Sequence, residues 1–163
     1  MKSSSDSYRF FVDGMLKGLM RWLRFLGFYA EEIRSLNAIK FEDNYYKDGY
    51  FLTASTLHFQ SWPLPQKILL REKNNEDQLQ YLQSQLKIYE QITLFSRCSL
   101  CNVRLTEISR SEAENKIPQR VLGSFKKFYY CSVCHRIYWE GGHVQRMIDK
   151  LKRMGIVINH YKE

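Results

Sequence analysis

Apolar and polar positions along the first 94 residues follow a pattern that predicts strands and helices in turn. The segment 9–13, RFFVD, has an apolar centre and ends in an acid, which is typical of a short buried strand. In 15–26 the apolar residues recur at the three- and four-residue spacing of a helix, and Gly27 is suited to end it. The same criteria predict strands at 28–33, 50–53 and 66–72, and helices at 37–47 and within 54–65.

One more helix completes this part of the pattern. Asn75 is placed as its N-cap, with Glu76 and Asp77 in the first turn and leucines at helical spacing beyond them. Strands that alternate with helices favour an α/β fold, in which crossover helices cover a parallel sheet. We therefore expect an α/β domain over 1–94. Because cysteine content and charge change there, we expect a second domain over 95–163, which includes a last helix at 143–154.

Positive charge is concentrated in the second of these domains. Residues 1–94 contain 12 Lys and Arg against 11 Asp and Glu, whereas residues 95–163 contain 13 against 6, and the whole chain has a net charge of +8. Such an excess favours a polyanionic partner such as RNA, and a merely solvated basic surface is the alternative. The candidate phosphate contacts are two helix faces of identical spacing and one lysine pair: Lys17, Arg21 and Arg24; Arg146, Lys150 and Arg153; Lys126 and Lys127.

Two features bear on the location of the protein. No apolar run approaches the roughly 18 residues that a membrane-spanning helix needs. The N-terminal sequence MKSSSDSYRFF has no uninterrupted apolar stretch and no small-residue cleavage site, so a secretory signal is not expected. We expect a cytoplasmic protein without a membrane partner.

All four cysteines fall into two CxxC motifs of the second domain. CSLC occupies 98–101 and CSVC occupies 131–134, and two such turns can bring four thiolates onto one ion. Disulfides are rare in the cytosol, and a redox motif needs only one exposed CxxC. The spacing therefore predicts a structural zinc site, with iron as the alternative metal and no open position for catalysis. The predicted ligands are Cys98, Cys101, Cys131 and Cys134.

One acidic residue marks a candidate catalytic position. Asp13 lies at the carboxyl end of the first predicted strand, directly before a helix. Ligands bind at that end of the strands in open α/β sheets, and a carboxylate there could hold Mg²⁺ or Mn²⁺. The alternative is that Asp13 only caps the helix that follows.

Several long motifs resemble one known family. They are FFVDGMLKGLMRWLRFLGF, the strand YFLT, EDQL, CSLCN, IPQRV, FYYCSVCHRIYWEGGH and QRM, in this order. Together they resemble the Mut-seven C-terminal RNase domain, from about Phe10 to Met154. The resemblance implies a PIN-like parallel sheet with crossover helices, followed by a small zinc ribbon and a C-terminal helix. It also implies a metal-dependent ribonuclease, in which Asp13 is the first acid of the site.

The family's other acids do not carry over onto this chain. The family usually follows its third strand with Thr-Arg-Asp, whereas this chain has Thr53, Ala54 and Ser55. The acids that could complete a site with Asp13 are Glu32, Glu42 and Asp43. We therefore expect a family member that binds RNA and whose nuclease activity is weak or lost. The alternatives are an active Mg²⁺- or Mn²⁺-dependent ribonuclease centred on Asp13, or a protein-interaction module such as one partner of a toxin–antitoxin pair.

Overall fold

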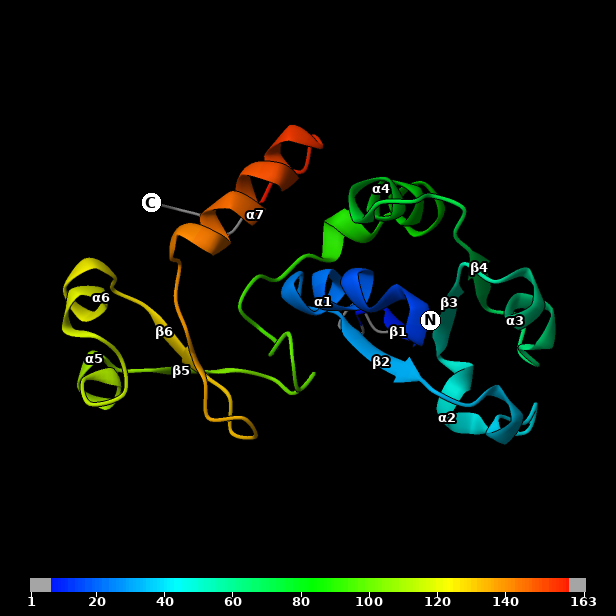
Figure 1. The fold of residues 1–163 in the computed structure, drawn as a ribbon, viewed down its shortest axis with the longest axis horizontal. Helices are drawn as coiled ribbons and strands as arrows, with labels where there is room; N and C mark the ends of the chain where they lie inside the picture. The colour runs from blue at the N-terminus through cyan, green and yellow to red at the C-terminus, as the bar shows by residue number, and fades with distance from the viewer. Residues whose placement is uncertain (1–6, 159–163) are drawn as a thin grey trace.

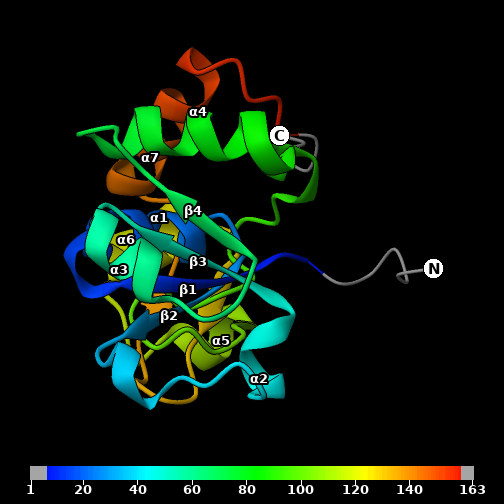
Figure 2. The ribbon, with the colours of Figure 1, turned by 90° about the vertical axis from the view of Figure 1, so that its right-hand side faces the viewer.

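A four-stranded parallel sheet organises the first part of the chain in the computed structural model, which describes residues 7–158. The strands are β1 (Arg9–Asp13), β2 (Tyr29–Ile33), β3 (Gly49–Thr53) and β4 (Lys67–Leu69). Their order in the sheet is β2-β1-β3-β4, and all three pairings are parallel (Figure 2). The most apolar strands, β1 and β3, lie in the centre because a central parallel strand is covered on both faces.

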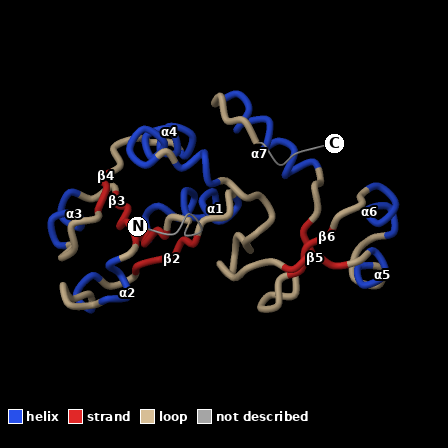
Figure 3. The backbone as a smooth tube through the Cα atoms, turned by 180° about the vertical axis from the view of Figure 1, so that it is seen from behind, coloured by secondary structure: helices blue, strands red, loops and turns tan. Residues whose placement is uncertain are grey.

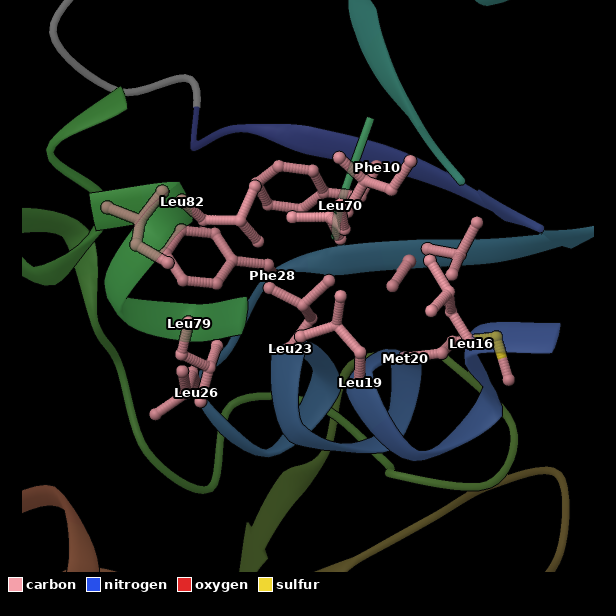
Figure 4. Packing of buried hydrophobic residues seen from close by; sticks show 14 of the residues in the cluster. Phe10, Leu16, Leu19, Met20, Leu23, Leu26, Phe28, Leu70, Leu79 and Leu82 are labelled. Carbon is pink, nitrogen blue, oxygen red and sulfur yellow. The ribbon is translucent and has the colours of Figure 1, made fainter. Parts of the chain in front are cut away.

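One face of the sheet packs against the longer helices. These are α1 (Lys17–Phe25), preceded by the short 3-10 helix η1 (Gly14–Leu16), and α4 (Asn75–Leu86), followed by η3 (Ile88–Gln91). The close view of this core shows Phe10 of β1 and Phe28 ahead of β2 among leucines of α1 and α4 (Figure 4). Gly27 ends the first helix with φ +99°, and a Cβ there would lie 2.4 Å from the carbonyl oxygen of Thr93. The chain therefore needs glycine at this turn, as the sequence predicts.

The opposite face is covered by shorter elements and an aromatic layer. The elements are η2 (Leu36–Ala38), α2 (Asn44–Lys47) and α3 (Thr56–Ser61). Trp62 stacks on Phe51 of β3, with ring centroids 4.2 Å apart, and both side chains are buried. Phe11 of β1 joins the same cluster. Asp13 and Thr53, which come two residues after Phe11 and Phe51, lie on this same face of the sheet.

The second part of the chain builds a small antiparallel sheet with its own core. Its strands are β5 (Thr106–Ile108), β6 (Phe128–Tyr130) and β7 (Ile137–Tyr138), and α5 (Arg110–Ala113) and α6 (Gln119–Ser124) lie beside them. Buried Ala113, Leu122 and Phe128 form its core. Seen from in front and from behind, this part lies to one side of the parallel sheet (Figures 1 and 3).

The last helix, α7 (Gly142–Arg153), returns from the small sheet to the first domain. Leu151 and Ile156 are buried in the same core as α1 and α4. Lys150 of this helix also lies 2.9 Å from Glu76 of α4. The boundary near residue 94 remains a prediction, but the core of the first domain includes residues from the C-terminal end of the described chain.

Most predicted elements are present, and two predictions are wrong. The helix expected over 37–47 is replaced by η2 and the four-residue α2, because that segment is polar and aromatic without a continuous apolar face. The N-cap of α4 is Asn74 and not Asn75: its side-chain oxygen accepts a hydrogen bond from the backbone N–H of Asp77 at 2.9 Å.

No helix of the described residues is long and apolar enough to cross a membrane. Residues 1–6 and 159–163, which include part of the N-terminal sequence used above and the outer ends of the expected domains, lie outside the described residues.

Candidate functional site

Asp13 lies at the carboxyl edge of the parallel sheet, as its place in the sequence predicts. It is the last residue of β1, it pairs in register with Ile33 of β2, and it is buried. The hydroxyl of Thr53, the last residue of β3, donates a hydrogen bond to its Oδ2 at 2.7 Å. The backbone N–H of Met15 lies 3.5 Å from Oδ1, a long distance for a helix cap. The carboxylate is therefore oriented mainly by the neighbouring strand.

A histidine that no sequence pattern indicated is the second partner of this carboxylate. The Nδ1 atom of His58 lies 2.5 Å from Oδ2 of Asp13. Ser55 begins α3 by accepting a hydrogen bond from the backbone N–H of His58 at 3.2 Å, and its own N–H donates to the Thr53 hydroxyl at 3.0 Å. The turn between β3 and α3 thus places the imidazole over the end of β1. Only the position of His58, in the first turn after a neighbouring strand, could have pointed to it.

The structure brings none of the three acids considered as helpers into contact with Asp13. Glu32 precedes the residue that pairs with Asp13, so its side chain leaves the opposite face of β2, and it lies 3.4 Å from Lys17 and 3.4 Å from Arg34. Glu42 is exposed, and Asp43 caps α2 by accepting from the N–H of Tyr45 at 3.1 Å. Among residues 7–158, no third His, Asp or Glu joins Asp13 and His58 in a cluster of ligand atoms.

The pair opens onto a cleft of about 370 Å³. Its lining includes both polar and apolar residues: Asp13, Ile33, Arg34, Ser35, Leu36, Asn37, Leu57, His58 and Ser61. Asp13 and Arg34 are its charged residues apart from the titratable imidazole of His58. A cleft with this composition can accept a polar, anionic group beside the imidazole.

The four predicted ligand cysteines meet in the second part of the chain. Their Sγ atoms all lie within 4.8 Å of one another, and none forms a disulfide. Cys98 and Cys134 have their sulfur atoms 3.8 Å apart. A tetrahedral shell with metal–sulfur bonds of about 2.3 Å has edges of about 3.8 Å, whereas a disulfide needs about 2.05 Å. The four thiols therefore fit a metal ion such as zinc.

The two CxxC turns have the same local geometry. In each, the N–H of the second cysteine points at the sulfur of the first, at 3.3 Å for Cys101 and 3.5 Å for Cys134. The residue that follows each pair has a left-handed backbone, with φ 67° at Asn102 and 59° at His135. The N–H of that residue donates to the carbonyl of the first cysteine at 2.9 Å in both turns. The two CxxC turns therefore form two equivalent halves of one metal-ligand cage.

The pKa values of the two thiols in the first CxxC turn shift in opposite directions. Burial raises the pKa of Cys98, but the Tyr138 hydroxyl and the backbone N–H groups of the first turn outweigh it and bring the pKa to about 7. Burial and the neighbouring Cys134 raise the pKa of Cys101 to about 12. A bound metal ion would have to displace the remaining protons, so metal affinity falls as the pH falls.

Arg24 connects the first CxxC turn to the first domain and is not part of an exposed stripe. It is buried, and its Nε donates to the carbonyl of Ala30 at 2.8 Å. Its Nη1 donates to the carbonyls of Leu100 at 2.8 Å and Ser99 at 3.2 Å. Burial lowers the pKa of this guanidinium, and the nearby cysteine thiols oppose that effect. Arg24 therefore does not share an exposed face with Lys17 and Arg21, as the sequence analysis expected, because the second part of the chain covers it.

The other candidate phosphate contacts differ in what surrounds them. Lys17 and Arg21 are exposed on α1, although Lys17 lies near Glu32, and Lys150 of α7 is paired with Glu76. The remaining four are exposed and have no acidic group within 4 Å in the described part of the chain: Lys126, Lys127, Arg146 and Arg153.

Comparison with known proteins identifies one family. A family model described as the Mut7-C RNAse domain matches residues 8–151, which is nearly the whole chain. No curated protein matches the chain, and no solved structure does.

Proposed function

Because the chain belongs to the Mut7-C RNase domain family, we propose that it binds RNA through its basic C-terminal part and has little metal-dependent nuclease activity. The main observation in support of this proposal is which side chains contact the carboxylate of Asp13. Its partners are a threonine and a histidine, where a metal-dependent nuclease needs converging carboxylates. The family's scaffold is kept while this part of the chemistry is depleted.

RNA binding is supported by the position of the free positive charge. Lys126 and Lys127 are exposed between α6 and β6, with no acidic partner among the described residues. Phosphate contacts by such side chains supply most sequence-independent affinity for nucleic acid. We infer a zinc ion at the four cysteines, which would add its charge and the charge of four thiolates, −2 in total. With this charge included, the half beyond residue 94 would still have a net positive charge. Reduced thiols agree with the expected cytoplasmic location, because disulfides are rare in that compartment.

The weak nuclease activity follows from how Mg²⁺ binds. This ion is held by one or two protein carboxylates together with waters and substrate phosphate, in a nearly ideal octahedron. Asp13 alone would hold it, with one oxygen already accepting from Thr53 and facing His58. A displacement of about 1 Å can cost roughly a hundredfold in rate, so cleavage with Mg²⁺ or Mn²⁺ is expected to be slow.

The proposal is tested by comparing two double charge reversals, one in the second part of the chain and one in the first domain. Lys126→Glu with Lys127→Glu should weaken binding of single-stranded RNA at least tenfold at about 50 mM salt. Lys40→Glu with Lys73→Glu, two exposed lysines of the first domain, changes the net charge equally and should weaken it less than threefold. Equal effects of both pairs would contradict an interface on the second part. A wild-type protein that binds no RNA at low salt would favour the protein-interaction alternative.

A further inference from the structure

We propose that Asp13 and His58 cleave RNA without a metal ion, with His58 as the general base. This inference rests on the proposed RNA binding and assigns a reaction to the cleft at the carboxyl edge of the sheet. It deepens that proposal by assigning a role to the groups around Asp13. They do not include the further carboxylates that would hold a metal ion, but they include the imidazole of His58, which Asp13 orients.

The geometry fixes which nitrogen of His58 is free. Nδ1 lies 2.5 Å from Oδ2 of Asp13, and a carboxylate at that distance requires a proton on Nδ1. Nε2 then bears the lone pair, and it has no hydrogen-bond partner among residues 7–158. The imidazole side chain is 40% exposed, whereas that of Asp13 is 11% exposed, so the carboxylate is shielded and the base reaches solvent.

Asp13 is held so that it can keep this orientation. The Thr53 hydroxyl donates to the same oxygen at 2.7 Å, and β1 and β3 are central strands of the sheet. A buried carboxylate that orients an imidazole and stabilises its protonated form is the arrangement that activates hydroxyl groups in many hydrolases. In these terms Asp13 is a positioning residue, and His58 is the group that contacts substrate.

The cleft supplies a place for the phosphate next to this base. Arg34 lines the same cleft, and its side chain is 85% exposed, so it can turn toward an anion. Its present contact with Glu32 is long, at 3.4 Å, and the Arg34 end of the pair is exposed to solvent, which weakens it. A guanidinium beside the phosphate would stabilise the negative charge that develops on the phosphorane oxygens.

The reaction that fits these groups is attack by the ribose 2′-hydroxyl. Nε2 of His58 takes the proton from this hydroxyl, and the 2′-oxygen forms a bond to phosphorus while the bond from phosphorus to the 5′-oxygen breaks. The leaving 5′-oxygen takes a proton from a water molecule, and the imidazolium returns its proton to the hydroxide that results. The products are a 2′,3′-cyclic phosphate and a free 5′-hydroxyl, and no electron donor or metal is needed.

The test separates this reaction from metal-dependent hydrolysis and from binding. A 5′-labelled single-stranded RNA is incubated with saturating protein in chelator, without Mg²⁺ or Mn²⁺, and the metal content of the protein is measured before and after. We expect cleavage that ends in 2′,3′-cyclic phosphate and is absent for the same sequence made of 2′-deoxynucleotides. The rate is measured over a range of pH, and the shape of this profile should differ between the wild type and Asp13→Asn, because Asp13 contacts the base directly; Asp13 and Arg34 are the charged groups that line the cleft beside His58.

Matched variants assign the activity to the pair. His58→Gln should lower the single-turnover rate by about 100-fold or more, since general-base catalysis contributes roughly that much. Asp13→Asn should do the same, because the amide no longer favours the required tautomer. His143→Gln, at an exposed position of α7, should leave the rate within twofold. RNA affinity and thermal unfolding of each variant are measured alongside, and both should stay close to the wild-type values.

Three outcomes would overturn the inference. Wild-type protein that binds RNA and does not cleave it in chelator would refute the pair and leave the proposed function intact. Cleavage that needs Mg²⁺ or Mn²⁺ and gives 5′-phosphate ends would show that Asp13 holds a metal ion. Absence of both binding and cleavage would refute this inference together with the proposed function.

Discussion

At the scale of single residues, Arg24 shows how tertiary contacts change the role of a side chain. Helical spacing correctly places it near Lys17 and Arg21 on α1, but spacing cannot show what covers the last turn of the helix. In the folded chain its guanidinium donates to carbonyls of β2 and of the first CxxC turn. If the guanidinium is removed, these carbonyl groups lose their hydrogen-bond donor, and leaving buried carbonyls unsatisfied lowers the stability of the fold.

Replacement of Arg24 therefore tests whether this contact holds the two parts together. Arg24→Gln should lower the free energy of unfolding by about 2–3 kcal/mol, because it removes charged hydrogen bonds to buried carbonyls. It should also speed metal release to a chelator, since the turn that holds Cys98 and Cys101 loses its support. Arg21→Gln is the matched control on the exposed side of the helix and should change stability by less than about 0.5 kcal/mol. Equal urea midpoints for the two variants would contradict the account.

At the scale of elements, the turn from β3 into α3 decides the chemistry of the site. Ser55 is the N-cap of α3, and it occupies the position at which the resemblance described above leads one to expect an acid. Aspartate is as good an N-cap as serine, and so is asparagine, so both can replace Ser55 with the helix start unchanged. The two replacements differ in charge alone.

Ser55→Asp should raise cleavage with Mg²⁺ or Mn²⁺ above the wild-type level, because a second carboxylate would stand at the edge where Asp13 lies. Ser55→Asn should not, since its amide adds no charge. The measurement is cleavage of labelled RNA with and without the metal ion. If the two variants cleave alike, the missing acid is not what limits metal-dependent activity.

Sequence patterns predict some of these helices and strands and miss others. The strands β1 to β4 and the helices α1, α4 and α7 have apolar residues at strand or helix spacing, so their existence follows from periodicity, and the CxxC motifs specify their ligands by local chemistry. The short strands β5, β6 and β7 were not located in this way, and β5 is mostly exposed. The segment 37–47 has no such face, and its structure depends on aromatic side chains that pack against β1 and on the cap at Asp43. His58 was missed for a related reason: its partner is 45 residues away in the chain and only the sheet brings them together.

At the scale of the whole molecule, the small sheet is tied to the first domain at two ends. Arg24 and Asn102 join it to α1 and β2, since the side chain of Asn102 accepts from the N–H of Ala30 at 3.0 Å. The chain leaves it through α7, whose Leu151 is buried in the core of the first domain. Disruption of the ligand cage should therefore affect both parts of the molecule.

Cys131→Ser tests this coupling. Wild-type protein should contain about one zinc or iron ion per chain, and the variant should contain none, because metal binding and folding of the cage are one equilibrium. The variant should lose protection against proteolysis first between residues 95 and 141, and the first domain should unfold at a lower temperature than in the wild type. Ser132→Ala, an exposed change in the same turn, is the control. A metal-free protein that stays folded through this part would refute the cage.

The central claim is that the molecule binds RNA through exposed positive charge on its second part. The most direct measurement is the affinity of wild-type protein for a labelled single-stranded RNA at 50 and 200 mM salt. Release of counterions from several phosphates predicts that the affinity falls about tenfold or more over this range, and that Lys126→Glu with Lys127→Glu makes the dependence on salt less steep. An affinity that does not change with salt, or no binding at 50 mM, would contradict the account.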